Sequence, residues 1–224
     1  MSKVHQVLLK KYEGNRVIRG LIQLIPFGIG SSIDVILTIT LDKINTERAT
    51  VFFDELAAGN VIVDEELLRS EDFLHCYFST AKYALNSRRR EKIKMFARLL
   101  KCSLKDSDLK DVDEYEDFLK ILDELSYREL KALSLWDEFS NWTRDKEEND
   151  FQWTNKFWKE FDNRLASELS ISQDEIPDFL TRISRTGCYE TFKGGYFDSE
   201  GGIGKLTPTY HRLKNFIIDN ECEG

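Results

Sequence analysis

The sequence predicts a mostly α-helical protein, built as a helical bundle followed by a small α+β module at the C-terminus. Three observations lead to this fold class. Only three prolines occur in 224 residues, so long stretches can remain helical. Apolar residues recur at helical spacing through most of the chain. A glycine-rich stretch with alternating aromatic residues interrupts that pattern near the end, which is typical of a β-hairpin.

The first 170 residues contain the stretches in which the helical pattern is clear. Ser126 followed by Glu129 is typical of a capping box at the start of one helix. The β-branched run VILTIT in the third stretch is compatible with a strand as well as a helix. We expect helices over residues 3–12, 16–25, 33–58, 71–85, 88–104, 114–125, 128–142 and 150–169.

The last part of the chain follows a different order. Ser172 and Glu175 predict the start of a helix that continues to Arg185. Residues 188–207 predict a hairpin, and Thr207-Pro208 predicts the start of a final helix over 209–219. Helix, hairpin and helix in this order resemble the end of a winged-helix module. We therefore expect a helical bundle over 1–170, with an alternative division at 105–113, and a winged-helix-like tail over 171–224.

Composition and charge argue against several functional classes. The net charge of −8 disfavours nucleic acid as the main partner, because phosphate binding needs a surplus of Lys and Arg. Four cysteines and three histidines are scattered without metal-ligand spacing, and no catalytic motif is present. We therefore expect no enzyme activity, cofactor, metal or small-molecule substrate. The N-terminus lacks the apolar core of a signal peptide, which predicts a cytoplasmic protein.

The least polar stretch runs from Gly20 to Leu41 and carries one charge. Its uncharged part, residues 20–33, is shorter than the roughly 20 residues that a membrane-spanning helix needs. A proline and two glycines also break it in the middle. The stretch is therefore either a buried helical hairpin or one that moves onto a membrane or a partner when triggered. In the second alternative the site residues are Pro26, Gly28, Gly30, Asp34 and Ile36.

A basic patch on the helix expected over 88–104 is the second candidate site. Its cations are set against one acid, Glu91, and could bind a lipid head group, an RNA backbone or an acidic partner. A charge run is more often the solvated face of a helix, whose other face here carries Ile93, Phe96 and Leu100. The patch consists of Arg88, Arg89, Arg90, Lys92, Lys94 and Arg98.

Aromatic residues are dense over 136–161. Aromatic residues at helical spacing are usually core residues, and we favour that interpretation. The alternative is a groove for a peptide or a second subunit, since tryptophan is favoured at interfaces. The tryptophans of that interface would be Trp136, Trp142, Trp153 and Trp158.

Four stretches follow one another within about residues 17–104: LIPFGIGSSIDVIL, ERATVFFDEL, SEDFLHCYF and RRREKIKMFARLL. This arrangement resembles a group of uncharacterised bacterial helical proteins associated with defence against phage or mobile elements. The tail, TGCYETFKGGYFDSEGGIGKLTPTYHRLKNFI, looks like the final hairpin and helix of winged-helix modules in such proteins. The resemblance implies a membrane-active or partner-regulated defence component, and it carries over no catalytic residues.

Together these patterns predict a non-enzymatic protein-interaction component of a bacterial anti-phage assembly, with a protein partner or self-association into an oligomer. The first alternative is an effector that uses the apolar hairpin 20–41 and becomes membrane-associated on activation. The second is a nucleic-acid-binding regulator. The tail disfavours that regulator, because it carries six Lys and Arg against nine acids, with Arg182 and Arg185 as its phosphate contacts.

Overall fold

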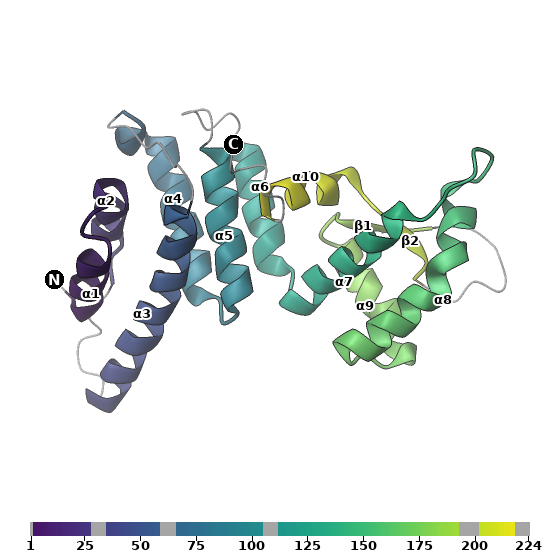
Figure 1. Ribbon diagram of the computed structural model, residues 1–224, viewed down its shortest axis with the longest axis horizontal. Coiled ribbons are helices and arrows are strands. Elements are labelled where there is room, and N and C mark those ends of the chain that lie inside the picture. Colours follow the sequence, from purple (N-terminus) through teal and green to yellow (C-terminus); the bar gives the residue numbers. More distant parts are fainter. Residues whose placement is uncertain (1, 28–34, 59–65, 105–111, 193–201, 218–224) are drawn as a thin grey trace. The chain divides into compact units, whose positions relative to one another are not determined.

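The computed structural model describes residues 2–27, 35–58, 66–104, 112–192 and 202–217, and these ranges are mostly helical with a small antiparallel sheet (Figure 1). The α-helices are α1 (Lys3–Lys11), α2 (Arg16–Leu24), α3 (Val35–Ala57), α4 (Glu71–Asn86), α5 (Arg90–Ser103), α6 (Val112–Glu124), α7 (Tyr127–Glu138), α8 (Asp150–Leu169), α9 (Ile176–Ser184) and α10 (Pro208–Ile217). Single 3-10 turns are Leu67–Arg69, Phe139–Asn141 and Gln173–Glu175. The strands are β1 (Tyr189–Thr191) and β2 (Gly204–Leu206).

The chain divides into two compact units. Unit 1 comprises Met1–Lys120 with Asn215–Gly224, and unit 2 comprises Ile121–Lys214. Residue 170, the expected boundary, lies inside unit 2, where α8 before it and α9 after it pack against each other. The alternative division at 105–113 falls mainly on residues outside the described ranges.

Most helix ends lie within a few residues of their expected positions, because local capping signals set them. In the capping box of α7, the Glu129 N–H donates to Ser126 Oγ at 3.3 Å, and the Ser126 N–H donates to Glu129 Oε2 at 2.6 Å. The Ser172–Glu175 box is also present, and it opens the 3-10 turn that leads into α9. The VILTIT run lies in α3, so this stretch is helical rather than a strand.

In unit 1, α3 packs against α1, α4 and α5. Phe52, Phe53 and Phe96 are fully buried at these contacts. The hydroxyl of buried Tyr77, on α4, donates to the Leu21 carbonyl of α2 at 2.5 Å, which satisfies its hydrogen-bonding need in the interior. The packing therefore fixes α2 and α3 against the α4–α5 pair.

In unit 2, aromatic side chains of α7 and α8 form the core. The Trp136 and Phe157 ring centroids lie 5.5 Å apart, and Phe139 stacks on Phe157 at 4.9 Å. Phe161 contacts Phe139 edge to face. These four rings therefore lie in the core, which is the interpretation favoured from the sequence.

The β-hairpin between α9 and α10 is held at its base by specific contacts. Tyr189 lies opposite Leu206 in the antiparallel pair. The Tyr189 hydroxyl donates to the Gly202 carbonyl at 2.8 Å, and Gly202 has a φ of +107°, which favours glycine. The expected order of helix, hairpin and helix is confirmed. The hairpin base therefore holds its side chains in defined positions beside α8.

Candidate functional site

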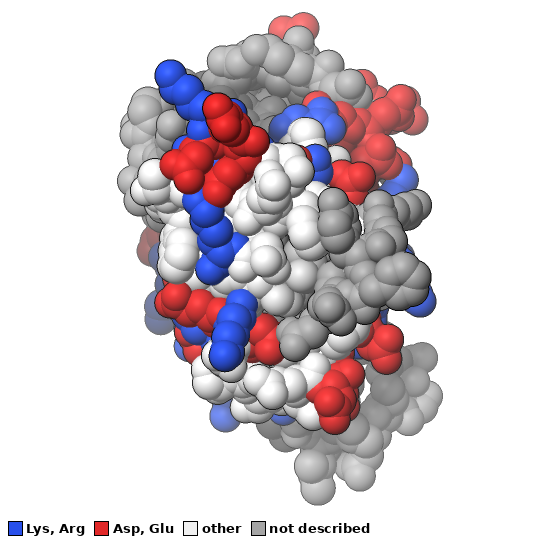
Figure 2. Space-filling model, turned by 90° about the vertical axis from the view of Figure 1, so that its right-hand side faces the viewer, with Lys and Arg blue, Asp and Glu red and all other residues white. Residues whose placement is uncertain are grey.

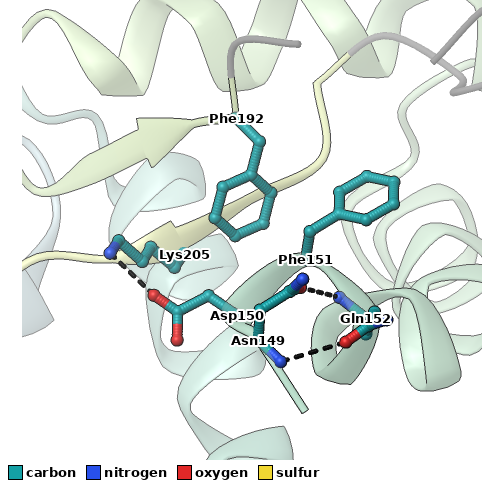
Figure 3. Close-up of a pocket in the computed structure, with 6 residues that line it drawn as sticks. All are labelled: Asn149, Asp150, Phe151, Gln152, Phe192 and Lys205. Atoms are coloured by element: carbon teal, nitrogen blue, oxygen red, sulfur yellow. Dashed lines mark hydrogen bonds and ion pairs between the residues drawn. The ribbon is translucent and has the colours of Figure 1, made fainter. Parts of the chain in front are cut away.

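A pocket of about 460 Å³ lies in unit 2, between the start of α8 and the base of the β-hairpin. Its volume falls within the roughly 300–1,000 Å³ of typical ligand sites. Figure 3 shows the side chains from α8 and from the hairpin facing the same space. The lining residues are Asn149, Asp150, Phe151, Gln152, Phe192 and Lys205.

The α8 side of the pocket is shaped by a capping box. The Gln152 N–H donates to Asn149 Oδ1 at 2.9 Å, and the Asn149 N–H donates to Gln152 Oε1 at 3.1 Å (Figure 3). Both side-chain oxygens are thus used within the helix start, and each side chain still carries an amide NH₂ group. These groups can donate hydrogen bonds to a carbonyl of a bound chain.

The hairpin side supplies an apolar wall. Phe192 directly follows β1, and its ring centroid lies 5.9 Å from that of Phe151 in an edge-to-face contact. Both rings are half-buried. The two rings can therefore contact an apolar side chain that enters the pocket.

Charges at the pocket are paired. Asp150 Oδ2 lies 2.8 Å from Lys205 Nζ, and Asp150 Oδ1 lies 2.8 Å from Arg144 Nη2. The hydrogen bond from Lys205 is the main cause that lowers the pKa of Asp150, and the same bond raises the pKa of Lys205. Both groups are therefore ionised near neutral pH, and the pocket holds no group poised for proton transfer among these side chains.

Trp142 is the exposed edge of the aromatic core. Its side chain is 42% exposed, although its ring centroid lies 5.8 Å from those of Phe139 and Phe157. The Trp153 Nε1–H donates to the Trp142 carbonyl at 3.3 Å, and the Arg144 guanidinium lies over the Trp153 ring at 5.6 Å. Because Arg144 also binds Asp150, Trp142 is joined to the pocket through neighbouring contacts.

We call Trp142, Phe151 and Phe192 together the aromatic surface of unit 2; Trp142 does not contact the Phe151–Phe192 pair directly and is linked to the pocket through Trp153, Arg144 and Asp150. Figure 2 shows uncharged side chains, polar and apolar alike, on one face, with basic side chains crossing them and acidic side chains nearby.

No known protein family, curated protein or solved structure matches this chain. The geometry of the described residues therefore has to carry the functional argument.

Three of the four predicted interface tryptophans are core residues. Trp136, Trp153 and Trp158 are 4%, 8% and 5% exposed, so they cannot contact a partner directly. Only Trp142 among the four is accessible. The helical spacing of these tryptophans predicted a core or an interface for all four alike. It did not distinguish Trp142, which lies outside the core, from the other three.

The predicted basic patch is divided by internal pairing. Arg98 Nε lies 2.7 Å from Glu55 Oε1, and Lys94 Nζ lies 3.7 Å from Glu55 Oε2. Lys92 lies over the Phe96 ring at 5.8 Å. Arg88, Arg89 and Arg90 are exposed at the start of α5.

The predicted apolar site is only partly described. Pro26 is exposed just after α2, and Ile36 belongs to α3. Gly28, Gly30 and Asp34 lie outside the described residues. In the described ranges, no helix has both the length and the apolar character needed to cross a bilayer.

His75 and Cys76 are neighbours in the sequence but have different surroundings. Cys76 is 1% exposed, and burial is the main cause that raises its pKa to about 11, so it is a thiol at neutral pH. His75 instead faces Glu116, with Nε2 2.6 Å from Oε1 on the surface. Within the ranges described, no three His, Cys, Asp or Glu residues are grouped to hold a metal ion.

Sequence reasoning did not single out most of the pocket residues. Asn149 and Gln152 do match a capping-box spacing, which marks a helix start but not a binding site. Phe192 and Lys205 belong to a hairpin that is distant in sequence from α8. No local signal indicates that these segments meet.

Proposed function

We propose that this chain is a non-enzymatic protein-interaction component that binds a protein partner through the aromatic surface of unit 2. The observation that carries this proposal is the exposed Trp142 indole. Tryptophan is among the residues most enriched at the centres of protein interfaces, and a solvated indole leaves a large apolar area in water.

The fixed position of Trp142 supports the proposal. The backbone N–H of Trp142 donates to the Phe139 carbonyl at 2.9 Å, and the backbone carbonyl of Trp142 accepts a hydrogen bond from the Trp153 indole N–H. The backbone on both sides of the indole is thus held in place before any partner arrives. Little conformational entropy is lost when such a residue enters an interface.

The pocket supports a partner segment with an uncharged anchor side chain. Phe151 and Phe192 provide apolar contacts, while Asn149 and Gln152 provide amide donors beside them. The charge of Asp150 is already matched by its cationic neighbours, so a charged anchor would gain no partner there.

The nucleic-acid alternative has less support in unit 2. Arg182, one of its two expected phosphate contacts, holds Glu129, with Nε 2.6 Å from Oε1. A phosphate would have to compete with this carboxylate. We therefore propose the α9–hairpin–α10 segment as a winged-helix-like tail whose wing contacts protein.

The wider context of the proposal comes from the sequence. The resemblance of residues 17–104 to phage-defence proteins suggests a cytoplasmic bacterial assembly as the setting. A second copy of the chain is one form that the partner can take, which would make the component an oligomer.

The experiment is site-specific photo-cross-linking in cells, with a benzophenone amino acid at Phe192 and, as a control position, at exposed Lys159 on α8. We expect an adduct of defined mass at Phe192 and none at Lys159. Trp142→Ala should weaken adduct formation about thirtyfold, the effect of losing a hot-spot tryptophan. The matched control is Phe78→Ala, because Phe78 is 40% exposed but lies in unit 1.

Mass spectrometry of the adduct identifies the partner as another protein or as a second copy of this chain, and either result supports a protein interface. An adduct at Phe192 that forms equally well in Trp142→Ala would contradict the proposed role of the aromatic surface. The absence of any adduct at Phe192 would contradict the proposed function itself.

A further inference from the structure

The first two helices of unit 1 contain five cations and no acid. Lys3, Lys10 and Lys11 belong to α1, and Arg16 and Arg19 belong to α2. The whole chain has 40 acids and a net charge of −8. Figure 1 shows both helices together on one side of unit 1. They therefore form a basic segment of an acidic protein.

The cations of this segment differ in their surroundings. Lys11 binds Asp54, with Nζ 2.7 Å from Oδ1. Arg19 Nη1 donates to the carbonyl of Glu13, which lies in the turn between the two helices. Three cations are exposed and form no ion pair in the part of the chain that the structure describes: Lys3, Lys10 and Arg16.

On α1, two of these cations flank an exposed apolar side chain. Lys3, Val7 and Lys10 are spaced by four and three residues, so they share one stripe of the helix. Val4 and Leu8 are at most 1% exposed and occupy the buried side. Val7 is 53% exposed, so the stripe faces solvent.

On α2, the same combination of a cation and an exposed apolar side chain occurs. Ile18, Leu21 and Ile22 are buried and bind this helix to the core. Arg16 is exposed at the first residue of the helix, and Leu24 is 37% exposed at its last residue. We call Lys3, Val7, Lys10, Arg16 and Leu24 the basic face of unit 1.

Helix stability does not explain two of the cations. Lys3 and Arg16 are the first residues of their helices. The positive end of the helix dipole favours acids at such positions, not cations. The N-caps, Ser2 and Asn15, already accept a backbone N–H with their side chains. An external partner with negative charge would account for both cations.

The spacing of the charges favours an extended anionic surface. Lys3 and Lys10 lie about 10 Å apart along α1, at roughly 1.5 Å per residue. A single small anion matches this spacing poorly. A nucleic acid could use the cations, but it would leave Val7 in water. An anionic bilayer matches both the cations and the apolar side chain between them.

We infer that the basic face of unit 1 binds the surface of an anionic lipid bilayer. Lys3, Lys10 and Arg16 contact the lipid head groups, and Val7 and Leu24 enter the interfacial layer. Because the apolar contribution is small, binding is peripheral. The inference rests on unit 1 alone and does not depend on the proposed interface of unit 2.

The test is co-sedimentation of the purified full-length chain with phosphatidylcholine vesicles that contain or lack phosphatidylserine. We expect binding only to vesicles with phosphatidylserine, weakening as the salt concentration rises. Lys3→Gln/Lys10→Gln/Arg16→Gln should weaken binding by roughly a hundredfold, because three cations near the membrane are lost. Val7→Gln/Leu24→Gln should weaken it about tenfold, because two apolar contacts are lost while the charge is kept.

Matched controls separate this face from general effects. Lys146→Gln/Lys159→Gln/Arg185→Gln removes the same charge from exposed positions of unit 2. Trp142→Gln removes an apolar side chain that is 42% exposed, also in unit 2. Both controls should bind vesicles as the wild type does. Circular dichroism confirms that each variant is folded.

Three results would overturn the inference. The first is no binding to phosphatidylserine vesicles at low salt. The second is binding that the loss of Lys3, Lys10 and Arg16 leaves unchanged. The third is binding that the loss of Val7 and Leu24 leaves unchanged. Fluorescence anisotropy with a DNA duplex completes the test, since duplex binding that depends on the three cations, without vesicle binding, would assign them to nucleic acid instead.

Discussion

Two glycines of this chain should respond in opposite directions to the same substitution. A Cβ atom at Gly204, on β2, would lie 2.8 Å from Cζ of Tyr189 and would also overlap the Glu190 carbonyl. A Cβ atom at Gly20, inside α2, meets no atom within 4 Å. Alanine therefore overpacks the hairpin at position 204 but fits the helix at position 20.

The expected magnitudes follow from these surroundings. Overpacking costs about 1–3 kcal/mol, and Gly204→Ala belongs near the upper end because the carbonyl of Glu190 is backbone. Glu190 is paired with Lys205 across the hairpin, so moving it would distort the register. Gly20→Ala should instead stabilise α2 by about 0.5–1 kcal/mol, since glycine is the poorer helix former.

The two units offer separate optical readouts. All four tryptophans of the chain lie between residues 136 and 158, within unit 2, so tryptophan fluorescence follows the unfolding of that unit. Gly204→Ala should lower the fluorescence-detected Tm by about 8 °C or more. Gly20→Ala should raise the stability seen by circular dichroism and leave the fluorescence transition at or above its wild-type midpoint.

A Gly204→Ala variant with an unchanged or higher fluorescence midpoint would refute the reasoning about the hairpin. If the variant unfolds earlier but is folded at the temperature of the cross-linking experiment, it should also lose the adduct at Phe192. Loss of stability with full cross-linking would show that the hairpin base does not position the proposed interface.

Two further predictions concern carboxylates of unit 2. Glu129→Ala should lower the free energy of unfolding in urea by about 2 kcal/mol, because it removes both the α7 capping bond and the ion pair with Arg182. Glu129→Gln keeps the capping bond and should lower it less. Equal losses for the two variants would contradict this division. Asp150 has a lowered pKa in the folded state, so its ion pairs stabilise the protein above the unfolded pKa of about 4 and this contribution is lost as the pH falls. Asp150→Asn should therefore lower Tm at about pH 7 and have a shrinking effect toward about pH 3, and a difference in Tm that stays constant with pH would oppose this assignment.

Much of the secondary structure could be predicted because its signals are local. The Ser126–Glu129 capping box places the start of α7, and Thr207-Pro208 places the start of α10, within the residues that carry the signals. The ambiguity of VILTIT is of a different kind. β-branched residues fit a strand and a helix, so only the surroundings of α3 select between them.

The candidate site could not be predicted in the same way. Helical spacing identifies the four tryptophans equally, yet Trp142 is exposed and the other three are buried, because exposure depends on which segments cover a ring. Likewise, a run of cations does not reveal that Glu55 pairs with Lys94 and Arg98. Both outcomes depend on residues far away in the sequence.

The sequence by itself determined the mostly helical character, the positions of the capped helix ends and the hairpin near the C-terminus, since each arises from interactions over a few residues. Only the tertiary structure decided that the starts of α8 and of β2 meet around Asp150 and Lys205, and that Val7 and Leu24 lie outside the core of unit 1. The physical reason is that packing brings together segments whose sequence separation hides their contact, and burial and ion pairing follow from that packing.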